Sequence, residues 1–246
     1  MICVILAAGL GTRLRGVSES KPLTPVAGMP LIEHVVRRAA AGGTNRFVVV
    51  TGHRAEELER FLGDLGRRLG LSMNFARVED WTKPNGFSVL AGSALVDGSY
   101  LLLMSDHLFD PQAVKGLACA SLPSADVVLA IDRNIAGELI DIDDATKVEV
   151  GPDGKIVRIG KDLAHYNAID TGAFLAGPRL AEAIEADIAA GGSGSLSAGV
   201  QRLADAGRAQ TFDIGAAKWI DVDDARMLAL AEGLMAREGL ATGSAA

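Results

Sequence analysis

The chain opens with a short apolar run, a glycine-containing loop and two cations. Residues 2–6 are continuously apolar, as in a strand that is buried on both faces of a parallel sheet. Gly9 and Gly11 follow, and at glycine the backbone can turn tightly and approach a bound anion. Arg13 and Lys21 lie on or beside the same loop. Backbone amides with fixed positive charge suit a nucleoside triphosphate, so the sequence predicts a phosphate site here.

Two common phosphate-binding motifs do not fit this loop. A P-loop would read Gly-x-x-x-x-Gly-Lys-Ser/Thr, and the loop lacks that pattern. A dinucleotide fingerprint needs a third small residue three positions after Gly11, where Leu14 stands. An ordinary strand-turn-helix with two surface cations is the structural alternative, although packing alone does not ask for these glycines and cations together.

Composition restricts the class of protein. With 246 residues, 49% hydrophobic and 22% charged, the chain is expected to be a soluble globular protein, with one large α/β domain or one domain with a small lobe. A net charge of −7 without a basic stripe argues against a nucleic-acid partner. Cys3 and Cys119 have no metal-site spacing and indicate a reducing compartment. No apolar stretch reaches membrane-spanning length and the N-terminus lacks a signal-peptide start, so we expect a cytoplasmic protein without membrane insertion.

Strands and helices are expected to alternate through the first half of the chain. Apolar strand patterns cover residues 2–6, 46–51, 72–77, 100–104 and 126–131. Helical patterns cover residues 30–42, 54–69, 86–95 and 111–119. This alternation predicts an α/β fold, a Rossmann-like, open and mostly parallel sheet with helices on both faces.

The pattern changes from about residue 137. Short alternating segments cover 140–142, 147–150 and 155–159, and Pro152-Asp153-Gly154 indicates a hairpin turn between the last two. We therefore expect an added antiparallel segment at the edge of the sheet. Three more helices are predicted at 178–190, 196–206 and 223–238. The whole chain, 1–246, is expected to form one domain. It would consist of a nucleotide-binding half (1–136), a half that binds metal and a second substrate, the acceptor (137–238), and a tail (239–246).

Three carboxylates are candidate ligands for Mg²⁺. Asp106 follows the apolar strand at 100–104, where packing gives no reason for a carboxylate. Asp221 and Asp223 alternate with apolar residues and so share one face of an extended segment. Mg²⁺ is commonly held by one or two carboxylates together with substrate phosphates. The alternatives are helix N-caps, Asp106 for the helix near 111 and Asp223 for the last helix.

A second group of polar residues suits a small phosphorylated polyol. Lys147 and Lys161 flank the antiparallel segments and would supply charge for a phosphomonoester. Tyr166, Asp170 and Thr171 could hydrogen-bond polyol hydroxyls. The alternative places both lysines on a solvated strand face, as for most lysines. The nearby acidic run at 141, 143 and 144 is expected to be a solvated loop.

The motifs also resemble a known family. Residues 5–14 together with Lys21-Pro22-Leu23 resemble the signature of nucleotidyltransferases that make nucleoside-diphosphate sugars and alcohols. Over nearly the whole chain the resemblance is to CTP:inositol-1-phosphate cytidylyltransferases, carried by residues 84–88, 104–107, 143–147, 159–163, 169–172 and 219–223. It implies transfer of CMP from CTP to myo-inositol 1-phosphate, giving CDP-inositol and pyrophosphate. One departure is Pro84, where the family pattern has glycine before Asn-Gly.

The resemblance also assigns roles to residues. Arg13 and Lys21 would be the catalytic cations that neutralise the triphosphate, and Asp106 and Asp221 match the places where the family holds its metal. The nucleotide would further be bound by the loop residues Leu6, Ala7, Ala8, Gly9, Gly11 and Thr12, and by His53, Asn85, Gly86 and Ser88 around the base and ribose. The asparagine amide offers both a donor and an acceptor to a base edge. The alternatives are a plain turn and N-cap at 85–88 and a solvated loop histidine at 53.

Other functions compete with this assignment. A sugar-1-phosphate nucleotidyltransferase, or a cytidylyltransferase for phosphocholine or a phosphonate, would share the same loop. A choline site should offer an aromatic cage, and only Tyr166 and Phe174 fall in the acceptor region of this aromatic-poor chain. An inactive nucleotide-sensing regulatory subunit would be expected to lack a cation or a carboxylate, yet all are present. The chain could act as a monomer or a homodimer.

Overall fold

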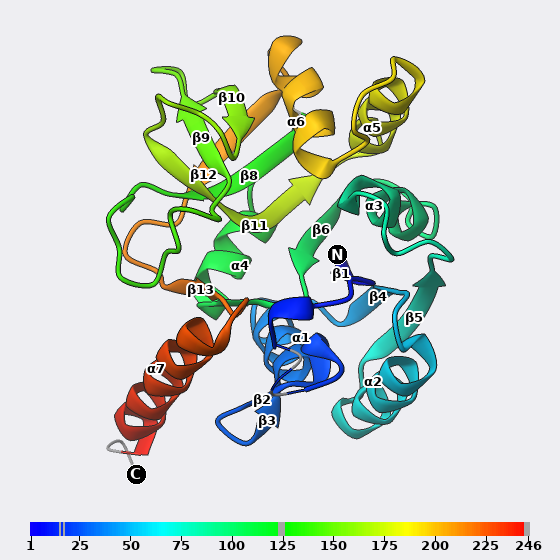
Figure 1. Ribbon diagram of the computed structural model, residues 1–246, viewed down its shortest axis with the longest axis vertical. Helices are drawn as coiled ribbons and strands as arrows, with labels where there is room; N and C mark the ends of the chain where they lie inside the picture. The colour runs from blue at the N-terminus through cyan, green and yellow to red at the C-terminus, as the bar shows by residue number, and fades with distance from the viewer. Residues whose placement is uncertain (15, 17, 123–125, 244–246) are drawn as a thin grey trace.

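One nine-stranded sheet runs through the molecule (Figure 1). The computed structural model describes residues 1–14, 16, 18–122 and 126–243. Seven strands follow one another in the order β10-β9-β11-β6-β1-β4-β5, and β8 pairs with both β11 and β12. All strands except β10 and β11 run in one direction. The sheet is therefore mostly parallel, as the sequence predicts.

The parallel strands come from the apolar runs of the first half. β1 (Ile2–Ala7) lies between β4 (Arg46–Thr51) and β6 (Tyr100–Met104), and β5 (Ser72–Arg77) pairs with the outer side of β4. Residues 3–7 of β1 are all buried, because helices cover both faces. These strands confirm the prediction to within one residue.

Two strands of the second half were not predicted. β11 (Ala168–Ala176) is the longest strand and runs antiparallel between β6 and β8 (Val127–Asp132). β12 (Ala209–Asp213) pairs with β8 in parallel. The prediction of a strand-like segment at 140–142 was wrong: these residues belong to an irregular loop that lines a cavity.

The predicted hairpin is present at the edge of the sheet. β9 (Lys147–Val150) and β10 (Ile156–Gly160) pair antiparallel around a turn in which Gly154 has a φ of 78°. β9 also pairs with the first residues of β11. This pairing brings the second half of the chain against the end of β6.

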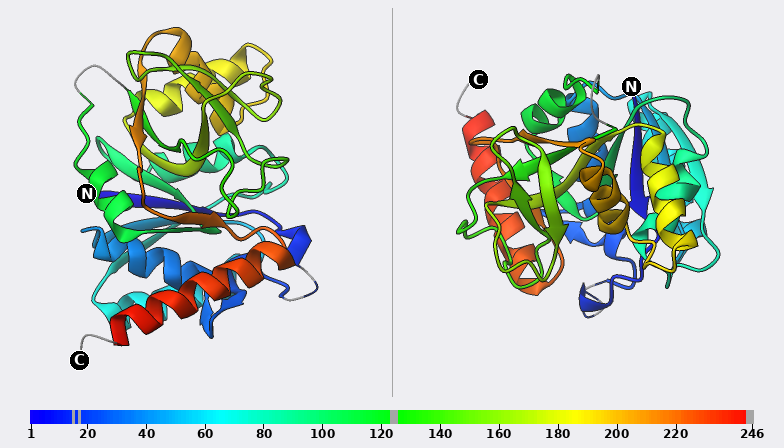
Figure 2. Two further views of the ribbon diagram at one scale, coloured as in Figure 1. Left: turned by 90° about the vertical axis from the view of Figure 1, so that its left-hand side faces the viewer. Right: turned by 90° about the horizontal axis from the view of Figure 1, so that it is seen from above.

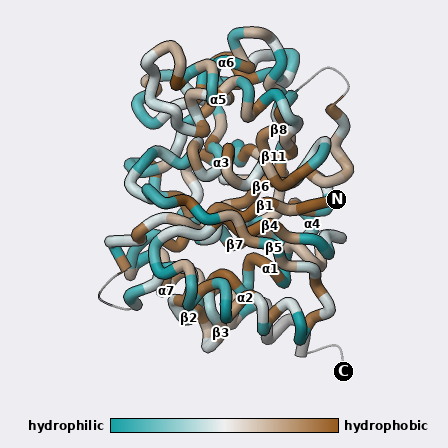
Figure 3. The backbone as a smooth tube through the Cα atoms, turned by 90° about the vertical axis from the view of Figure 1, so that its right-hand side faces the viewer, coloured by the Kyte–Doolittle hydropathy of each residue, from teal (hydrophilic) through white to brown (hydrophobic). Residues whose placement is uncertain are grey.

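Helices cover both faces of the sheet (Figure 2). Cys3 and Ile5 of β1 point to one hydrophobic core, and Val4 and Leu6 point to the other. Figure 3 shows apolar residues concentrated along the central strands. The first core is covered by α1 (Leu31–Ala41), α2 (Ala55–Leu69), α4 (Pro111–Ala118) and α7 (Ala225–Gly243). The second is covered by α3 (Asn85–Ser93), α5 (Arg179–Ala189) and α6 (Leu196–Asp205).

Short elements complete the fold. β7 (His107–Phe109) and β13 (Trp219–Asp221) form a two-stranded antiparallel ribbon, which pairs Asp221 with His107. Two 3-10 turns, η1 (Thr12–Leu14) and η2 (Lys21–Leu23), follow β1, and a small hairpin joins β2 (Pro25–Val26) to β3 (Met29–Pro30).

The last helix is longer than the sequence suggests. α7 continues to Gly243, so the predicted tail at 239–246 is helical through that residue, and the remainder lies outside the described residues. Among the helices of the described residues, none is long and apolar enough to cross a lipid bilayer.

Candidate active site

The polar residues of the site lie where strands end on one edge of the sheet. β1 leads into the Gly9–Gly11 loop and β6 leads directly into Asp106. β11 runs the other way, so its beginning, at Asp170, reaches the same edge. In open α/β sheets ligands bind at the carboxyl ends of the parallel strands. Topology therefore brings together residues from distant parts of the chain.

Lys21 lies at the centre of a carboxylate cluster. Its ammonium is 2.5 Å from Asp106 Oδ2 and 4.0 Å from Asp221 Oδ1, and it donates a hydrogen bond to Asp223 Oδ1. The Lys21 side chain is only 8% exposed. Burial favours the neutral amine, but the three carboxylates outweigh burial and raise the pKa of Lys21 well above its usual range.

The pKa values of Asp106 and Asp223 are shifted in opposite directions. Burial disfavours ionisation of Asp106, but Lys21 and His107 outweigh it and hold the pKa of Asp106 below its ordinary value. Burial and the neighbouring Asp221 charge raise the pKa of Asp223. Besides Lys21, the Arg13 guanidinium lies 2.9 Å from Asp223 Oδ2, so these carboxylates face more than one positive charge.

His107 joins the cluster from β7. Its Nδ1 lies 2.6 Å from the Thr171 carbonyl oxygen, so Nε2 is the nitrogen that faces Asp221 at 3.3 Å and Asp106 at 3.6 Å. Burial opposes protonation, but Asp221 and Asp106 raise the pKa of His107 to about 10. A side chain on Gly172 could not fit, since a Cβ there would lie 2.5 Å from His107 Nδ1.

The cluster fits a divalent metal. Asp106, His107 and Asp221 each offer a ligand atom, and these atoms lie within 4.8 Å of one another. Asp221 Oδ1 is buried without a hydrogen-bond partner in the part of the chain that the structure describes. Such an oxygen is costly to bury unless it meets a partner, and carboxylate oxygens are ligands that Mg²⁺ prefers.

The structure decides against the capping alternatives for these carboxylates. The N-cap of α4 is Asp110, whose Oδ1 accepts from the Gln112 amide at 2.8 Å. At the start of α7, Asp224 accepts from the Met227 amide at 2.8 Å. Asp106 and Asp223 face Lys21 instead.

A cavity of about 360 Å³ lies over the glycine-containing loop. Gly11 has a φ of 58°, and a Cβ there would lie 2.3 Å from Lys21 Cβ, so the fold itself requires glycine. A Cβ at Gly9 would meet no protein atom within 4 Å, so its missing side chain leaves space in the cavity. The predicted residues that line it are Leu6, Ala8, Gly9, Gly11, Thr12, Arg13, Lys21, Asn85, Ser88, Asp106 and Asp223.

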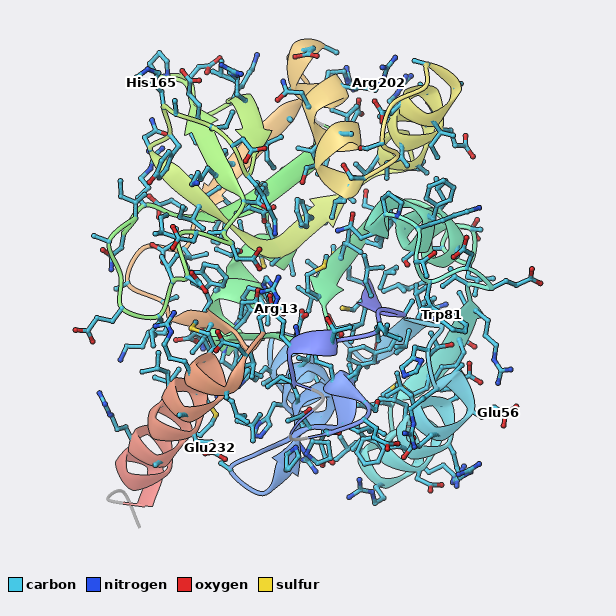
Figure 4. The ribbon with its side chains drawn as sticks, viewed as in Figure 1. Arg13, Glu56, Trp81, His165, Arg202 and Glu232 are labelled. Atoms are coloured by element: carbon cyan, nitrogen blue, oxygen red, sulfur yellow. The ribbon has the colours of Figure 1, made fainter. Side chains whose placement is uncertain are left out.

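A second cavity, of about 280 Å³, lies on the other side of the carboxylates. It is lined by the predicted acceptor residues Lys161 and Asp170. Burial raises the pKa of Asp170 to about 6, although its Oδ1 accepts from the Gly172 amide at 2.7 Å. The residues that line both cavities are Arg13, Asn85, Met104, Asp106 and Asp223. Arg13 is labelled near the middle of the molecule in Figure 4.

Some predicted acceptor residues do not line either cavity. The prediction for Thr171 was wrong: its side chain is fully buried and its hydroxyl donates to the Ala130 carbonyl at 2.8 Å. Lys147 donates to the Lys161 carbonyl at 2.9 Å and lies over the Tyr166 ring. Neither Lys147 nor Tyr166 lines the 280 Å³ cavity.

Three predicted nucleotide residues also do not line the 360 Å³ cavity. Ala7 is buried in the core, and a Cβ at Gly86 would lie 2.1 Å from the Gly194 carbonyl oxygen. His53 packs against Trp81, with ring centroids 5.9 Å apart. Asn85 does line the cavity, but its Oδ1 accepts from the Leu196 amide at 2.9 Å, which leaves its amide donors for a ligand.

The sequence did not identify several residues of the site. Asp144, expected in a solvated loop, bridges Arg13 at 2.8 Å and Lys161 at 2.6 Å. Burial opposes ionisation, but these two cations hold the pKa of Asp144 well below its usual range. Trp81 and Lys83 line the 360 Å³ cavity (Trp81 is labelled in Figure 4). Only the position of Asp144 in a motif of the resembled family could have pointed to it.

Most of this chain is similar in sequence to curated proteins of known name. A bifunctional IPC transferase and DIPP synthase from Rubrobacter xylanophilus is 37% identical over 172 residues, which are 70% of this chain and 37% of that protein. The protein of the same name from Archaeoglobus fulgidus is 34% identical over 175 residues, 71% of this chain and 32% of that protein. The chain thus matches about a third of the length of these curated relatives.

A solved structure and a family model agree with these relatives. The inositol-1-phosphate CTP transferase from T. maritima has a TM-score of 0.82 at 26% identity, with 92% of this chain and 90% of that chain covered. The model of the MobA-like NTP transferase domain matches residues 3–198. The chain belongs to the family of MobA-like NTP transferase domains.

Proposed function

We propose that this protein transfers CMP from CTP to myo-inositol 1-phosphate, giving CDP-inositol and pyrophosphate. One observation carries the proposal: two cavities meet at Arg13, Asp106 and Asp223. A transferase must bring a nucleotide and an acceptor together at a shared, charge-neutralising centre. The names of the relatives from Rubrobacter and T. maritima support CTP and an inositol phosphate as the substrates.

The cavity residues divide between the two substrates. We assign the triphosphate to the Gly9–Gly11 loop with Arg13 and Lys21, and the base to Asn85 and Ser88. The acceptor occupies the cavity that contains Lys161 and Asp170. Residues 1–136 therefore form the nucleotide-binding half, and most of the acceptor residues come from 137–238.

In the reaction, an oxygen of the acceptor phosphomonoester forms a bond to the α-phosphorus of CTP. The bond from that phosphorus to the bridging oxygen breaks, and pyrophosphate leaves with the electron pair. Both reactants are polyanions, so Arg13 and Lys21 lower the barrier by neutralising charge on the phosphates. Asp106, Asp221 and Asp223 would hold Mg²⁺, which supplies further neutralisation of phosphate charge when bound.

A substrate panel tests this proposal. CTP is supplied with myo-inositol 1-phosphate, glucose 1-phosphate or phosphocholine, and pyrophosphate release is measured. We expect the highest kcat/KM with inositol phosphate, and a lower kcat/KM when UTP or ATP replaces CTP. A higher value with glucose 1-phosphate or phosphocholine would overturn the acceptor, and equal values for CTP and UTP would overturn the cytidylyl assignment. No pyrophosphate release with any pair would favour a regulatory nucleotide-binding protein.

A further inference from the structure

Asp144 holds a cation of the nucleotide loop and a cation of the acceptor cavity at once. Its Oδ2 lies 2.8 Å from Arg13 Nη1 and its Oδ1 lies 2.6 Å from Lys161 Nζ. Arg13 comes from η1 and Lys161 directly follows β10, so the two cations come from different halves of the chain. Asp144 itself lies in an irregular loop before β9 and is not a substrate ligand in the function proposed above.

Arg13 and Lys161 together could bind an anion other than the Asp144 carboxylate. Arg13 also contacts Asp223 Oδ2 at 2.9 Å, so a second partner fixes its orientation. The side chains of Arg13 and Lys161 are 53% and 54% exposed, so a ligand in the cavity can reach both. All three residues line the 280 Å³ acceptor cavity.

A phosphomonoester matches this pair of cations more closely than a carboxylate does. Guanidinium and ammonium groups bind phosphate oxygens through charge-assisted hydrogen bonds, and a dianionic phosphate offers more charge and more acceptors than one carboxylate. The position also lies next to the carboxylate cluster that both cavities share, where the acceptor oxygen would have to meet the nucleotide.

We propose that the phosphate of the acceptor binds between Arg13 and Lys161 in the place of the Asp144 carboxylate, so that Asp144 is an internal competitor for the acceptor. This inference rests on the proposed function for the identity of the acceptor. Because an incoming group must displace a carboxylate from two cations, the site favours a phosphomonoester over a singly charged or neutral acceptor. Asp144 thereby contributes to acceptor specificity without touching the substrate.

Binding of inorganic phosphate tests the competition without requiring turnover. The proteins compared are the wild type, D144N and a matched control, D143N, which removes the same charge from an exposed neighbour in the same loop. We expect D144N to bind phosphate roughly two- to fivefold more tightly by calorimetry, the range expected for removing a partly exposed ion pair. D143N should bind as the wild type does. The gain should disappear in the double variant D144N/K161A, because the second cation is then missing.

Steady-state kinetics provide the second measurement. We expect D144N to lower the KM for the acceptor by a similar factor, with the KM for CTP unchanged. Phosphate binding in D144N that equals or falls below that of the wild type, or a gain that D143N shares, would overturn the inference. A fall in kcat with an unchanged acceptor KM would also overturn it, because Asp144 would then position Arg13 for the nucleotide. If inositol 1-phosphate is not the acceptor, the proposed function fails, but a phosphate gain in D144N alone still supports the competition.

Discussion

The Lys21 ammonium lies 2.5 Å from Asp106 Oδ2, although 85 positions separate the two residues in the sequence. Lys21 begins η2, after the glycine-containing loop, and Asp106 lies in the turn between β6 and β7. This ion pair joins the segment after the glycine-containing loop to the carboxylate cluster. Substitutions on either side should therefore affect catalysis much more than they affect the sheet.

Replacing Asp106 by Asn should remove most activity. The change keeps the side-chain volume but removes a charge that neutralises Lys21 and that would bind metal. We expect kcat to fall on the order of a hundredfold or more at saturating Mg²⁺, with an unchanged circular dichroism spectrum. Asp97→Asn, at an exposed position before β6, is the matched control. Wild-type kcat in the Asp106 variant would refute its assignment to the metal site.

Alanine at Gly9 should weaken nucleotide binding, whereas alanine at Gly11 should lower stability. Gly9→Ala adds a methyl group to open space in the nucleotide cavity, so the Tm should stay unchanged while the KM for CTP rises at least about tenfold. Gly11→Ala meets Lys21 and a positive φ, so it should lower the free energy of unfolding by more than about 1 kcal/mol. Thermal melts and CTP titrations of both variants decide this. A destabilised Gly9 variant that still binds CTP normally would contradict the assignment of the cavity.

Asn85 allows base recognition to be separated from stability. Its Oδ1 accepts from the Leu196 amide at the start of α6, a bond that Asp can still make. Asn85→Asp should therefore keep the Tm, whereas Asn85→Ala should cost about 1 kcal/mol. Both lose the amide donor, so the preference for CTP over UTP in kcat/KM should fall by about one to two decades. An unchanged preference in both variants would show that Asn85 does not read the base.

Lys161→Ala should affect the acceptor more than the nucleotide. Lys161 lines the acceptor cavity but not the nucleotide cavity. We therefore expect the KM for the acceptor to rise about tenfold, with the KM for CTP nearly unchanged. Lys155→Ala is the control, since Lys155 is half-exposed in the β9–β10 turn and lines neither cavity. Equal increases in both KM values for Lys161→Ala would contradict its assignment to the acceptor.

His107 lies with Asp106 and Asp221 in a group that could hold a metal ion, and its Nε2 would have to lose its proton to act as a ligand. Imidazole nitrogen suits Mn²⁺ better than Mg²⁺, which prefers oxygen. His107→Ala should therefore weaken Mn²⁺ binding about tenfold, measured by electron paramagnetic resonance of free Mn²⁺. His165→Ala, at an exposed position, is the control. Unchanged Mn²⁺ affinity in the His107 variant would exclude His107 as a ligand.

Local sequence determined the elements whose signals are short-range. The continuous apolar run of β1 and the β9–β10 turn with Gly154 at positive φ need only neighbouring residues, and both were predicted. The carboxylate at Asp106 was noticeable because a charge directly after a buried strand has no local partner. Lys21 was a candidate because it is a cation beside the glycine-containing loop, and Asp223 because it shares one face of an extended segment with Asp221.

Tertiary structure decided what depends on contacts between distant segments. The sequence of β11 mixes apolar residues with Asp170, Thr171 and Gly172, so it gives no clear strand pattern. It forms a strand because it pairs with both β6 and β8. Thr171 is polar in the sequence, but the fold buries its hydroxyl against Ala130. Asp144 looks like a solvated acidic residue until the fold places Arg13 and Lys161 on either side of its carboxylate. Local patterns encode backbone conformation and which residues carry charge, whereas the partner of each charge depends on long-range pairing, which no single segment of the sequence contains.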